Sequence, residues 1–134
     1  MAVKMSVAVR NAMLNAIETG IGTSAVLKIR TGAPPSGIAD ADSDVLATMS
    51  LDSDWMAAAD AGAKALTGTW SDTSADGAGE AGHFRLYASN GSTQHIQGTV
   101  TATGNGGDMT LDNINIAAGQ TVTITGFTLT AGNA

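Results

Sequence analysis

The spacing of apolar residues changes once along this chain, and that change constrains the fold more than any other feature of the sequence. In residues 3–19, the polar residues Lys4, Asn11, Asn15 and Glu18 follow one another at steps of seven, four and three, which places them on one stripe of a helix. After this segment, apolar residues recur at every second position, as they do along a β-strand. The sequence therefore predicts one N-terminal helix followed by a β-rich domain.

The rest of the expected helix is apolar over an arc that is wide for a helix on a protein surface. We expect Gly20 and Gly22 to end the helix, because glycine tolerates the left-handed backbone of a helix C-terminus. An apolar arc of this width indicates that the helix lies between its own domain and a second surface, which belongs either to the same chain or to another. The apolar positions are Val7, Val9, Met13, Leu14, Ala16 and Ile17.

Short segments that alternate apolar and polar residues fill the remainder of the chain. Asn90-Gly91 is a strong hairpin signal, because both central residues of a type I′ turn need positive φ. Residues 52–64 are compatible with a short helix capped by Asp52 or Ser53, or with a long loop held by Trp55. We expect an exposed loop at residues 71–82 and strands near residues 25–30, 45–51, 65–70, 83–88, 93–102, 109–116 and 121–130, the last with a bulge at Gly126.

Short strands at spacings near ten residues predict a mainly β protein, an antiparallel β-sandwich or jelly-roll-like barrel preceded by one N-terminal α-helix. We expect residues 1–22 to form a helical arm and residues 23–134 to form the β-sandwich domain. The absence of cysteine excludes disulfides and thiolate metal sites. With 13% charged and 43% hydrophobic residues, the composition is that of a folded, soluble chain without a membrane-spanning run.

Charge is distributed unevenly along the chain. Residues 1–30 carry four basic residues and one acid, whereas the remainder carries two basic residues and eleven acids, and the net charge is −6. This balance argues against nucleic acid as a partner, because phosphate binding needs clustered Lys and Arg. The basic N-terminal part and the acidic remainder would let copies of the chain bind one another head to tail, or let the chain bind an acidic partner. The N-terminus lacks the pattern of a secretory signal, which favours synthesis and folding in a cytoplasm.

Catalytic motifs are scarce. No nucleophile elbow or paired carboxylate stands out, so we expect no enzyme activity and no cofactor. His83 and His95 occupy polar-face positions on either side of the Asn90-Gly91 turn, and we expect them to lie opposite each other, where they would share a metal ion or form a pH-sensitive contact.

Three aspartates stand at alternate positions in one loop. Asp40, Asp42 and Asp44 match the first, third and fifth ligands of a calcium loop, but Val45 and Leu51 stand where that loop needs glycine and a bidentate glutamate. An EF-hand is therefore excluded. The three aspartates remain weak candidates for a looser divalent metal site, and a solvated acidic loop is the other interpretation.

Several segments together resemble small structural proteins of tailed bacteriophages, most closely a head decoration or cement protein. They span most of the chain: residues 8–17 (AVRNAMLNAI), 27–32 (LKIRTG), 46–51 (LATMSL), 81–87 (AGHFRLY) and 118–122 (AGQTV). The resemblance implies a virion protein on the capsid exterior that binds the major capsid protein shell as a homo-oligomer, a trimer fitting local threefold positions. It implies neither nucleic acid nor membrane as a partner.

The N-terminal segment is the expected binding arm, because it is apolar and cationic. Two other classes of function stay open at this stage. One is a tail or fibre-associated adhesin that presents Trp55, Trp70 and Tyr87 to host glycan, and the other is a metal-dependent domain that uses the aspartates and histidines. The residues expected to contact a partner are Lys4, Val7, Arg10, Met13, Leu14 and Ile17.

Overall fold

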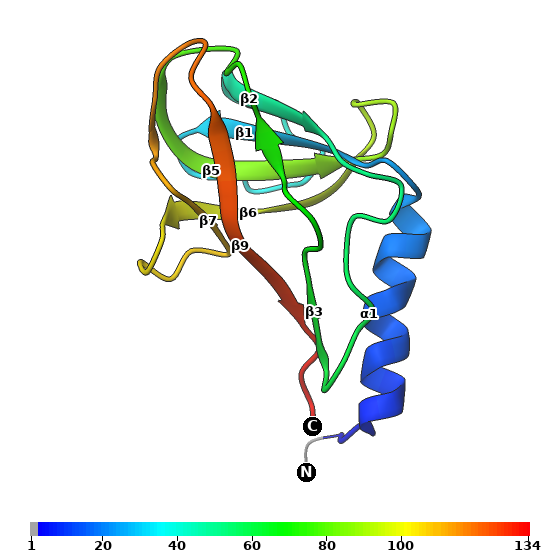
Figure 1. Ribbon diagram of the computed structural model, residues 1–134. Helices are drawn as coiled ribbons and strands as arrows, with labels where there is room; N and C mark the ends of the chain where they lie inside the picture. Colours follow the sequence, from blue (N-terminus) through cyan, green and yellow to red (C-terminus); the bar gives the residue numbers. More distant parts are fainter. Residues whose placement is uncertain (1–2) are drawn as a thin grey trace.

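The computed structural model describes residues 3–134 and is mainly β, with 39% of residues in strands and 11% in helix (Figure 1). This confirms the expected class, one N-terminal helix and a curled, mostly antiparallel sheet consistent with a sandwich or barrel-like fold. The helix is α1 (Val7–Ile21). The strands are β1 (Val26–Thr31), β2 (Val45–Ser50), β3 (Ala63–Ala65), β4 (Ser71–Asp72), β5 (Gly79–Tyr87), β6 (Gln94–Ala102), β7 (Met109–Leu111), β8 (Asn115–Ile116) and β9 (Val122–Thr130).

Local signals set both ends of α1. Ser6 is the N-cap, and its side chain accepts a hydrogen bond from the backbone N–H of Val9. Gly22 is the C-cap, with φ at 96°, and its N–H donates to the carbonyl of Glu18. The helix expected over residues 3–19 is therefore displaced toward the C-terminus, because Ser6 and Gly22 are the caps. The expected arm over residues 1–22 includes residues 1 and 2, which lie outside the described residues.

The sheet follows the order β2-β1-β5-β6-β7-β9-β3, with β4 pairing with β9 and β8 with β5. All the pairs are antiparallel except β6 with β7. The register between β7 and β9 shifts where Thr110 pairs with Gly126 and Leu111 with Ile124. This extra residue in β9 confirms the bulge expected at Gly126, and it lets Ile124 and Phe127 both face the core.

Residues 52–82 depart most from the sequence-based expectation. The strand expected at residues 65–70 is wrong, because the short strands β3 and β4 lie on either side of it. The loop expected at residues 71–82 is also wrong, since it contains β4 and the start of β5. Residues 52–64 contain no helix. Trp55 is fully buried there and donates its indole N–H to the carbonyl of Gly22 at 2.9 Å, which supports the long-loop interpretation.

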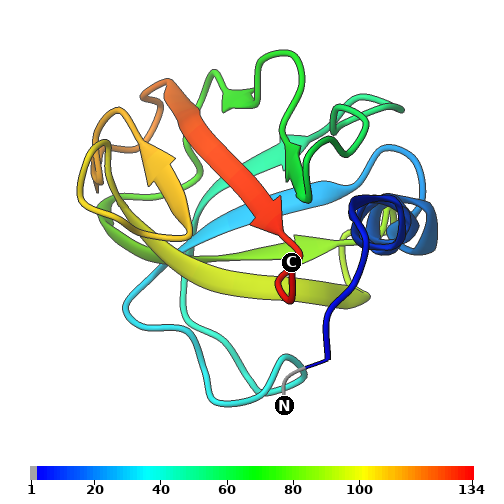
Figure 2. The same cartoon turned by 90° about the horizontal axis from the view of Figure 1, so that it is seen from below.

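A chain of aromatic rings runs through the core. Trp55 and Trp70 have ring centroids 6.0 Å apart, Trp70 and Phe127 are 5.7 Å apart, and Phe127 and Phe84 are 5.4 Å apart. These tilted and edge-on arrangements are favourable for aromatic pairs. The four rings link the long loop, β5 and β9, and so join the segment that contacts α1 to the sheet (Figure 2).

We predict that Gly82→Ala destabilises the protein by about 1–3 kcal/mol, because a Cβ at this position meets backbone that cannot retract. It would contact the carbonyl oxygen of Gly32 and lie 2.6 Å from its carbonyl carbon. Urea unfolding measures the effect. The control is Gly132→Ala, where nothing lies within 4 Å of the added Cβ. Equal stabilities for the two variants would contradict the close approach of Gly32 and Gly82.

Candidate functional site

The helix α1 packs on its own chain with its polar side facing inward. Asn11 Oδ1 accepts the backbone N–H of Gly62 at 2.9 Å, and Asn15 Oδ1 accepts that of Ala59 at 3.0 Å. Glu18 belongs to the same stripe and also bonds to this loop. Three of the four side chains that the periodicity placed on one polar stripe are therefore hydrogen-bonded to the loop beside α1, whereas the fourth, Lys4, is exposed.

A buried lysine fastens this contact. Lys64 in β3 is 2% exposed, and its Nζ lies 2.9 Å from each of three acceptors: Glu18 Oε2, Asn15 Oδ1 and the carbonyl of Ala57. Because an ammonium group has three N–H donors, this set satisfies it completely. Glu18 Oε1 in turn accepts the backbone N–H of Met56 at 3.1 Å. We call Glu18, Asn15 and Lys64 the helix clamp.

The protonation of Glu18 reflects this environment. Burial raises its pKa, but the hydrogen bonds from Lys64 and from the Met56 N–H, together with the positive charge of Lys64, outweigh that effect. The pKa of Glu18 therefore lies below its ordinary value. The carboxylate remains charged, and the helix clamp remains ionic, well into the acidic range.

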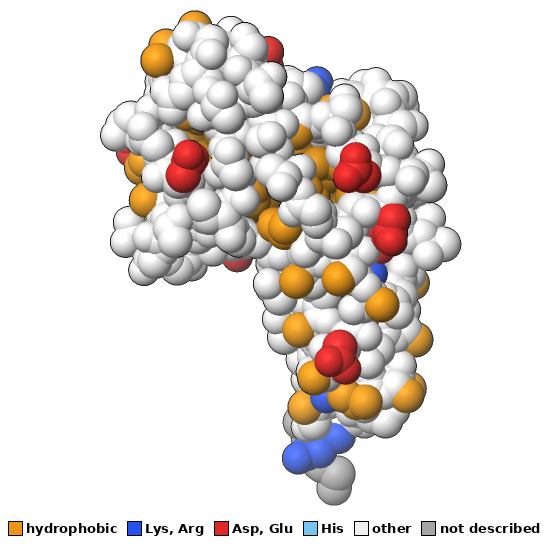
Figure 3. Space-filling view, viewed as in Figure 1, with side chains coloured by type: hydrophobic (Ala, Val, Ile, Leu, Met, Phe, Trp, Pro, Cys, Tyr) orange, Lys and Arg blue, Asp and Glu red, His pale blue; other side chains and the backbone are white. Residues whose placement is uncertain are grey.

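With its polar side inward, α1 presents apolar side chains to solvent. Val7, Val9 and Met13 are 47–48% exposed and Val3 is 76% exposed, whereas Ile38, at 36%, is the one other exposed large hydrophobic residue of residues 3–134. Figure 1 shows α1 extending away from the sheet beside β3 and the end of β9. Apolar side chains gather over this extension in Figure 3, with basic side chains at its tip. Val9 and Met13 lie one turn apart on one side of α1, Val7 lies in its first turn and Val3 precedes it; we call these four residues together the outer face of α1.

The six residues expected to contact a partner divide into two groups. Lys4, Val7 and Met13 are exposed. In contrast, Leu14 is buried at 3%, and Arg10 is half-buried and donates from NH1 to the carbonyl of Ala131 at 3.3 Å. Ile17 is half-buried.

Val9 belongs to the exposed group and was not among the expected contacts, although its place on the apolar arc was clear from the periodicity. The signal that could have separated the two groups is the pair Asn11 and Asn15. Their amides can replace backbone partners along a loop, whereas an exposed stripe is more often charged.

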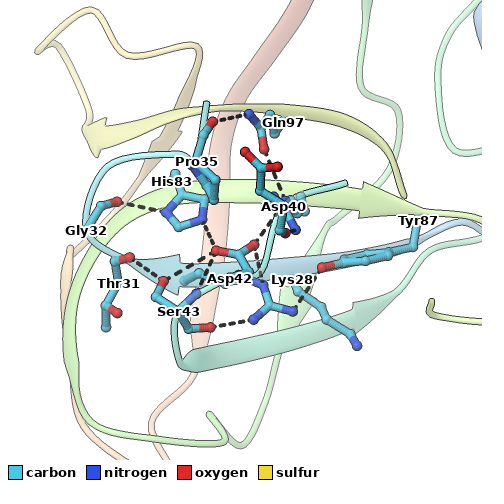
Figure 4. Close-up of polar contacts among 12 residues, drawn as sticks. Lys28, Thr31, Gly32, Pro35, Asp40, Asp42, Ser43, His83, Tyr87 and Gln97 are labelled. Carbon is cyan, nitrogen blue, oxygen red and sulfur yellow. Dashed lines mark hydrogen bonds and ion pairs between the residues drawn. The ribbon is translucent and has the colours of Figure 1, made fainter. Parts of the chain in front are cut away.

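A second polar cluster is buried beneath the loop of residues 32–44 (Figure 4). The Asp42 side chain is 5% exposed, and its Oδ2 forms ion pairs with Arg30 Nε at 3.1 Å and Arg85 Nε at 3.0 Å. Its Oδ1 lies 2.8 Å from His83 Nε2 and accepts the backbone N–H of Ser43 at 2.8 Å. One carboxylate thus contacts three basic side chains from β1 and β5.

The same basic side chains hold the backbone of the loop. His83 Nδ1 lies 2.8 Å from the carbonyl of Gly32, and Arg85 donates to the carbonyls of Asp40 at 2.9 Å and Gly37 at 3.2 Å. Since both ring nitrogens of His83 face oxygen acceptors, the imidazolium form donates at both. The cluster therefore closes the loop over the sheet and leaves its charged groups committed to one another.

This burial corrects the expectation for the strand near residues 83–88. His83, Arg85 and Tyr87 alternate with the apolar residues, yet they are 0–3% exposed. The expected opposition of His83 and His95 is wrong, because His83 pairs with Thr99 and His95 is exposed. A hairpin centred on Asn90-Gly91 brings residue 98, rather than 95, opposite residue 83, and the register shift between Leu86 and Tyr87 makes that partner Thr99.

The three aspartates of the loop do not converge. Asp42 serves the basic cluster, while Asp40 is exposed and accepts the backbone N–H of Gly37 at 2.7 Å. Asp44 is exposed. Within residues 3–134, no three carboxylate or imidazole side chains are arranged to hold a metal ion.

The pKa of Asp42 is lowered. Burial alone raises it, but hydrogen bonds from the Ser43 N–H and from His83, with the positive charges of His83 and Arg30, outweigh that effect. The folded chain thus holds this carboxylate in its charged form at a pH where the unfolded chain protonates it.

Comparison of the chain with protein-family models, with curated proteins and with solved structures finds no match. Within the part of the chain described, no helix has the length and apolarity to span a membrane. The function must therefore be inferred from the outer face of α1 and the two buried polar clusters.

We predict that Glu18→Ala destabilises the protein by about 3 kcal/mol, because it leaves the buried Lys64 ammonium without its counterion. Thermal or urea unfolding measures the effect. The control is Glu80→Ala, since Glu80 is exposed. A loss no larger than that of the control would show that the helix clamp does not hold α1.

We predict that Asp42→Asn lowers stability at neutral pH by about 3 kcal/mol and flattens its acid dependence. The folded pKa of Asp42 lies below the ordinary value of 3.8, so its stabilisation is complete above that value and is lost as pH falls through the folded pKa. Urea unfolding between about pH 5 and pH 2 measures the profile. Asp44→Asn, at an exposed position of the same loop, is the control. A parallel loss of stability in the wild type and in Asp42→Asn would contradict this role.

Proposed function

We propose that this chain is a virion structural protein of a tailed bacteriophage, a capsid decoration protein that binds the outside of the major capsid protein shell and stabilises the head. The outer face of α1, with Lys4 beside it, is the surface that binds. The class of protein is suggested by the sequence resemblance, and the mode of attachment follows from the exposure of α1.

One observation carries the proposal: four of the five large exposed hydrophobic residues within residues 3–134 lie in the first two turns of α1 or just before it, on its outer face as defined above. Clustered apolar side chains on a folded protein mark interaction surfaces, whereas scattered ones do not. The helix clamp also fixes this face before any partner arrives. A partner therefore loses little conformational entropy in binding it.

The remaining chemistry of the molecule supports a structural role. Asp42, His83 and Arg85 bond to one another and to the chain itself, so these groups hold a loop closed. A decoration protein needs many copies of a modest interface, and the array of sites on a shell multiplies their effect. A homotrimer at local threefold positions is the oligomer we propose for that array.

The adhesin alternative loses its basis among the aromatic residues. Trp55, Trp70 and Tyr87 are 0–3% exposed, so their faces are not available to a glycan. Trp55 and Trp70 instead form part of the aromatic core. A protein located in the tail would also have to bind its partner through the outer face of α1.

We predict that the purified protein co-sediments with shells assembled from the major capsid protein of the same phage and saturates at a fixed number of copies per capsid subunit. The double variant Val9→Glu, Met13→Glu should bind at least tenfold more weakly. Each buried side chain of this size contributes about 1.5–3 kcal/mol, and about 1.4 kcal/mol corresponds to a factor of ten. The helical signal in circular dichroism should stay unchanged.

The control is Ile38→Glu, which places one of these two charges at the exposed hydrophobic residue that lies outside the N-terminal segment. Full binding by the double variant would remove α1 as the attachment surface. Absence of binding by the wild type would overturn the decoration proposal and direct the search to the tail.

A further inference from the structure

The strand β6 has a partner on only one side along most of its length. Residues 94–99 pair with β5, and residues 100–102 pair with β7 on the opposite side. Because β7 is three residues long, it leaves the edge of residues 94–99 without a strand on that side. The same holds for residues 128–130 of β9, which pair with β3 and extend past the end of β7.

One bond shows which backbone groups face the open side. Asp108 immediately precedes β7, and its Oδ2 accepts the backbone N–H of Thr99 at 2.9 Å. The N–H of Thr99 therefore points away from β5. Since alternate residues of a strand direct their backbone groups to the same side, Gln97 also directs its N–H and carbonyl to the open edge.

A hollow lies beside this edge. Its volume is about 420 Å³, and Ile96 and Gln97 of β6 line it together with Phe127 and Leu129 of β9. The two strands meet through β7 and splay apart beyond it, as Figures 1 and 2 show together. The lining is mixed: Phe84, Ile96, Phe127 and Leu129 are apolar, whereas Gln97, Asp108, Thr128 and Thr130 are polar.

The edge of residues 94–99 lacks most of the features that usually prevent strand addition, and its one irregularity is a register shift at His95. Exposed edge strands are commonly protected by charged side chains, by proline or by a covering loop. Residues 94–99 contain no Lys, Arg, Asp, Glu or Pro. In contrast, the edge of β2 is covered, because Leu46 accepts the backbone N–H of Asp76 and Asp72 accepts that of Thr48.

We propose that the open edge of β6 binds an extended segment of a partner protein, which adds a strand in line with β7 and places alternate apolar side chains in the hollow. Such a strand would cover residues 94–99, a length of about 20 Å. The recess between two splayed strands admits a single extended chain more readily than the edge of a folded domain.

Charge selects among extended segments. Asp108 lines the hollow and is exposed, and the chain has a net charge of −6. The segment therefore carries a Lys or Arg near Asp108 and apolar residues at every second position. This site is separate from the outer face of α1, and the inference stands whether or not the chain decorates a capsid.

The test uses the full chain labelled with ¹⁵N and the acetylated, amidated peptide Lys-Val-Thr-Val-Thr-Val as the probe. We expect chemical-shift changes confined to residues 94–99, 108 and 126–130. Two twins of the peptide carry backbone N-methyl groups, one at the three Val residues and the other at the two Thr residues. One twin should bind at least tenfold more weakly, because only one set of amides faces β6.

Two variants test the hollow and the charge. Leu129→Glu should weaken binding at least tenfold, whereas Ala118→Glu at an exposed turn should change it less than twofold. Asp108→Asn keeps an oxygen acceptor for Thr99. It should weaken binding of the lysine peptide two- to fivefold, but it should not weaken binding of a peptide with Gln in place of Lys.

Absence of shift changes at residues 94–99 with millimolar peptide, or equal binding by both methylated twins, would overturn the proposal. Because the twins are tested on the wild-type chain, this result does not depend on the folding of Leu129→Glu. Equal effects of Asp108→Asn on the two peptides would overturn the requirement for a basic residue.

Discussion

The ammonium group of Lys64 is the contact on which the surface of this molecule depends. Removing a charged amine from water costs several kcal/mol unless hydrogen-bond acceptors and a counterion replace the water. Here Glu18 and Asn15 of α1 supply them, so the lysine can be buried only while the helix is docked. Asn11, Asn15 and Glu18 are thereby turned toward the loop beside the helix, and the apolar residues of its first two turns are left for solvent or for a partner.

The Asp42 cluster applies the same principle at the other end of the sheet. Arg30, His83 and Arg85 stand on strands whose neighbouring residues form the core, and a loop places a single carboxylate against all three. The same side chains also bond to backbone carbonyls of that loop, and Arg30 in addition donates to the Tyr87 hydroxyl. Two acidic side chains, Glu18 and Asp42, thus attach the two long segments that lack regular structure, and both have lowered pKa values because of it.

Periodicity predicted the parts of the fold in which one strand face is buried and the other is wet. It located β1, β6 and β9 well, and the slip in parity at Gly126 marked a real bulge. It could not find β3 and β4, because two or three residues contain no period. Periodicity also could not predict which side of α1 faces the rest of the chain. Asn11, Asn15 and Glu18 form the same pattern whether they bond to water or to other groups of the protein, such as Lys64. Likewise, Arg85 looked solvated because its counterion comes from a loop 43 residues earlier in the chain.

Residues near the two ends of the described chain lie together at the foot of α1. Met5 donates its N–H to the carbonyl of Asn133 at 2.7 Å, and Figure 1 places the C-terminus there. The turn at residues 117–121 lies at the far end of the molecule. A peptide or reporter fused at either terminus would crowd the apolar helix, whereas one inserted into that turn would be held away from it. The turn at residues 117–121 is therefore the better place to insert a foreign peptide or reporter.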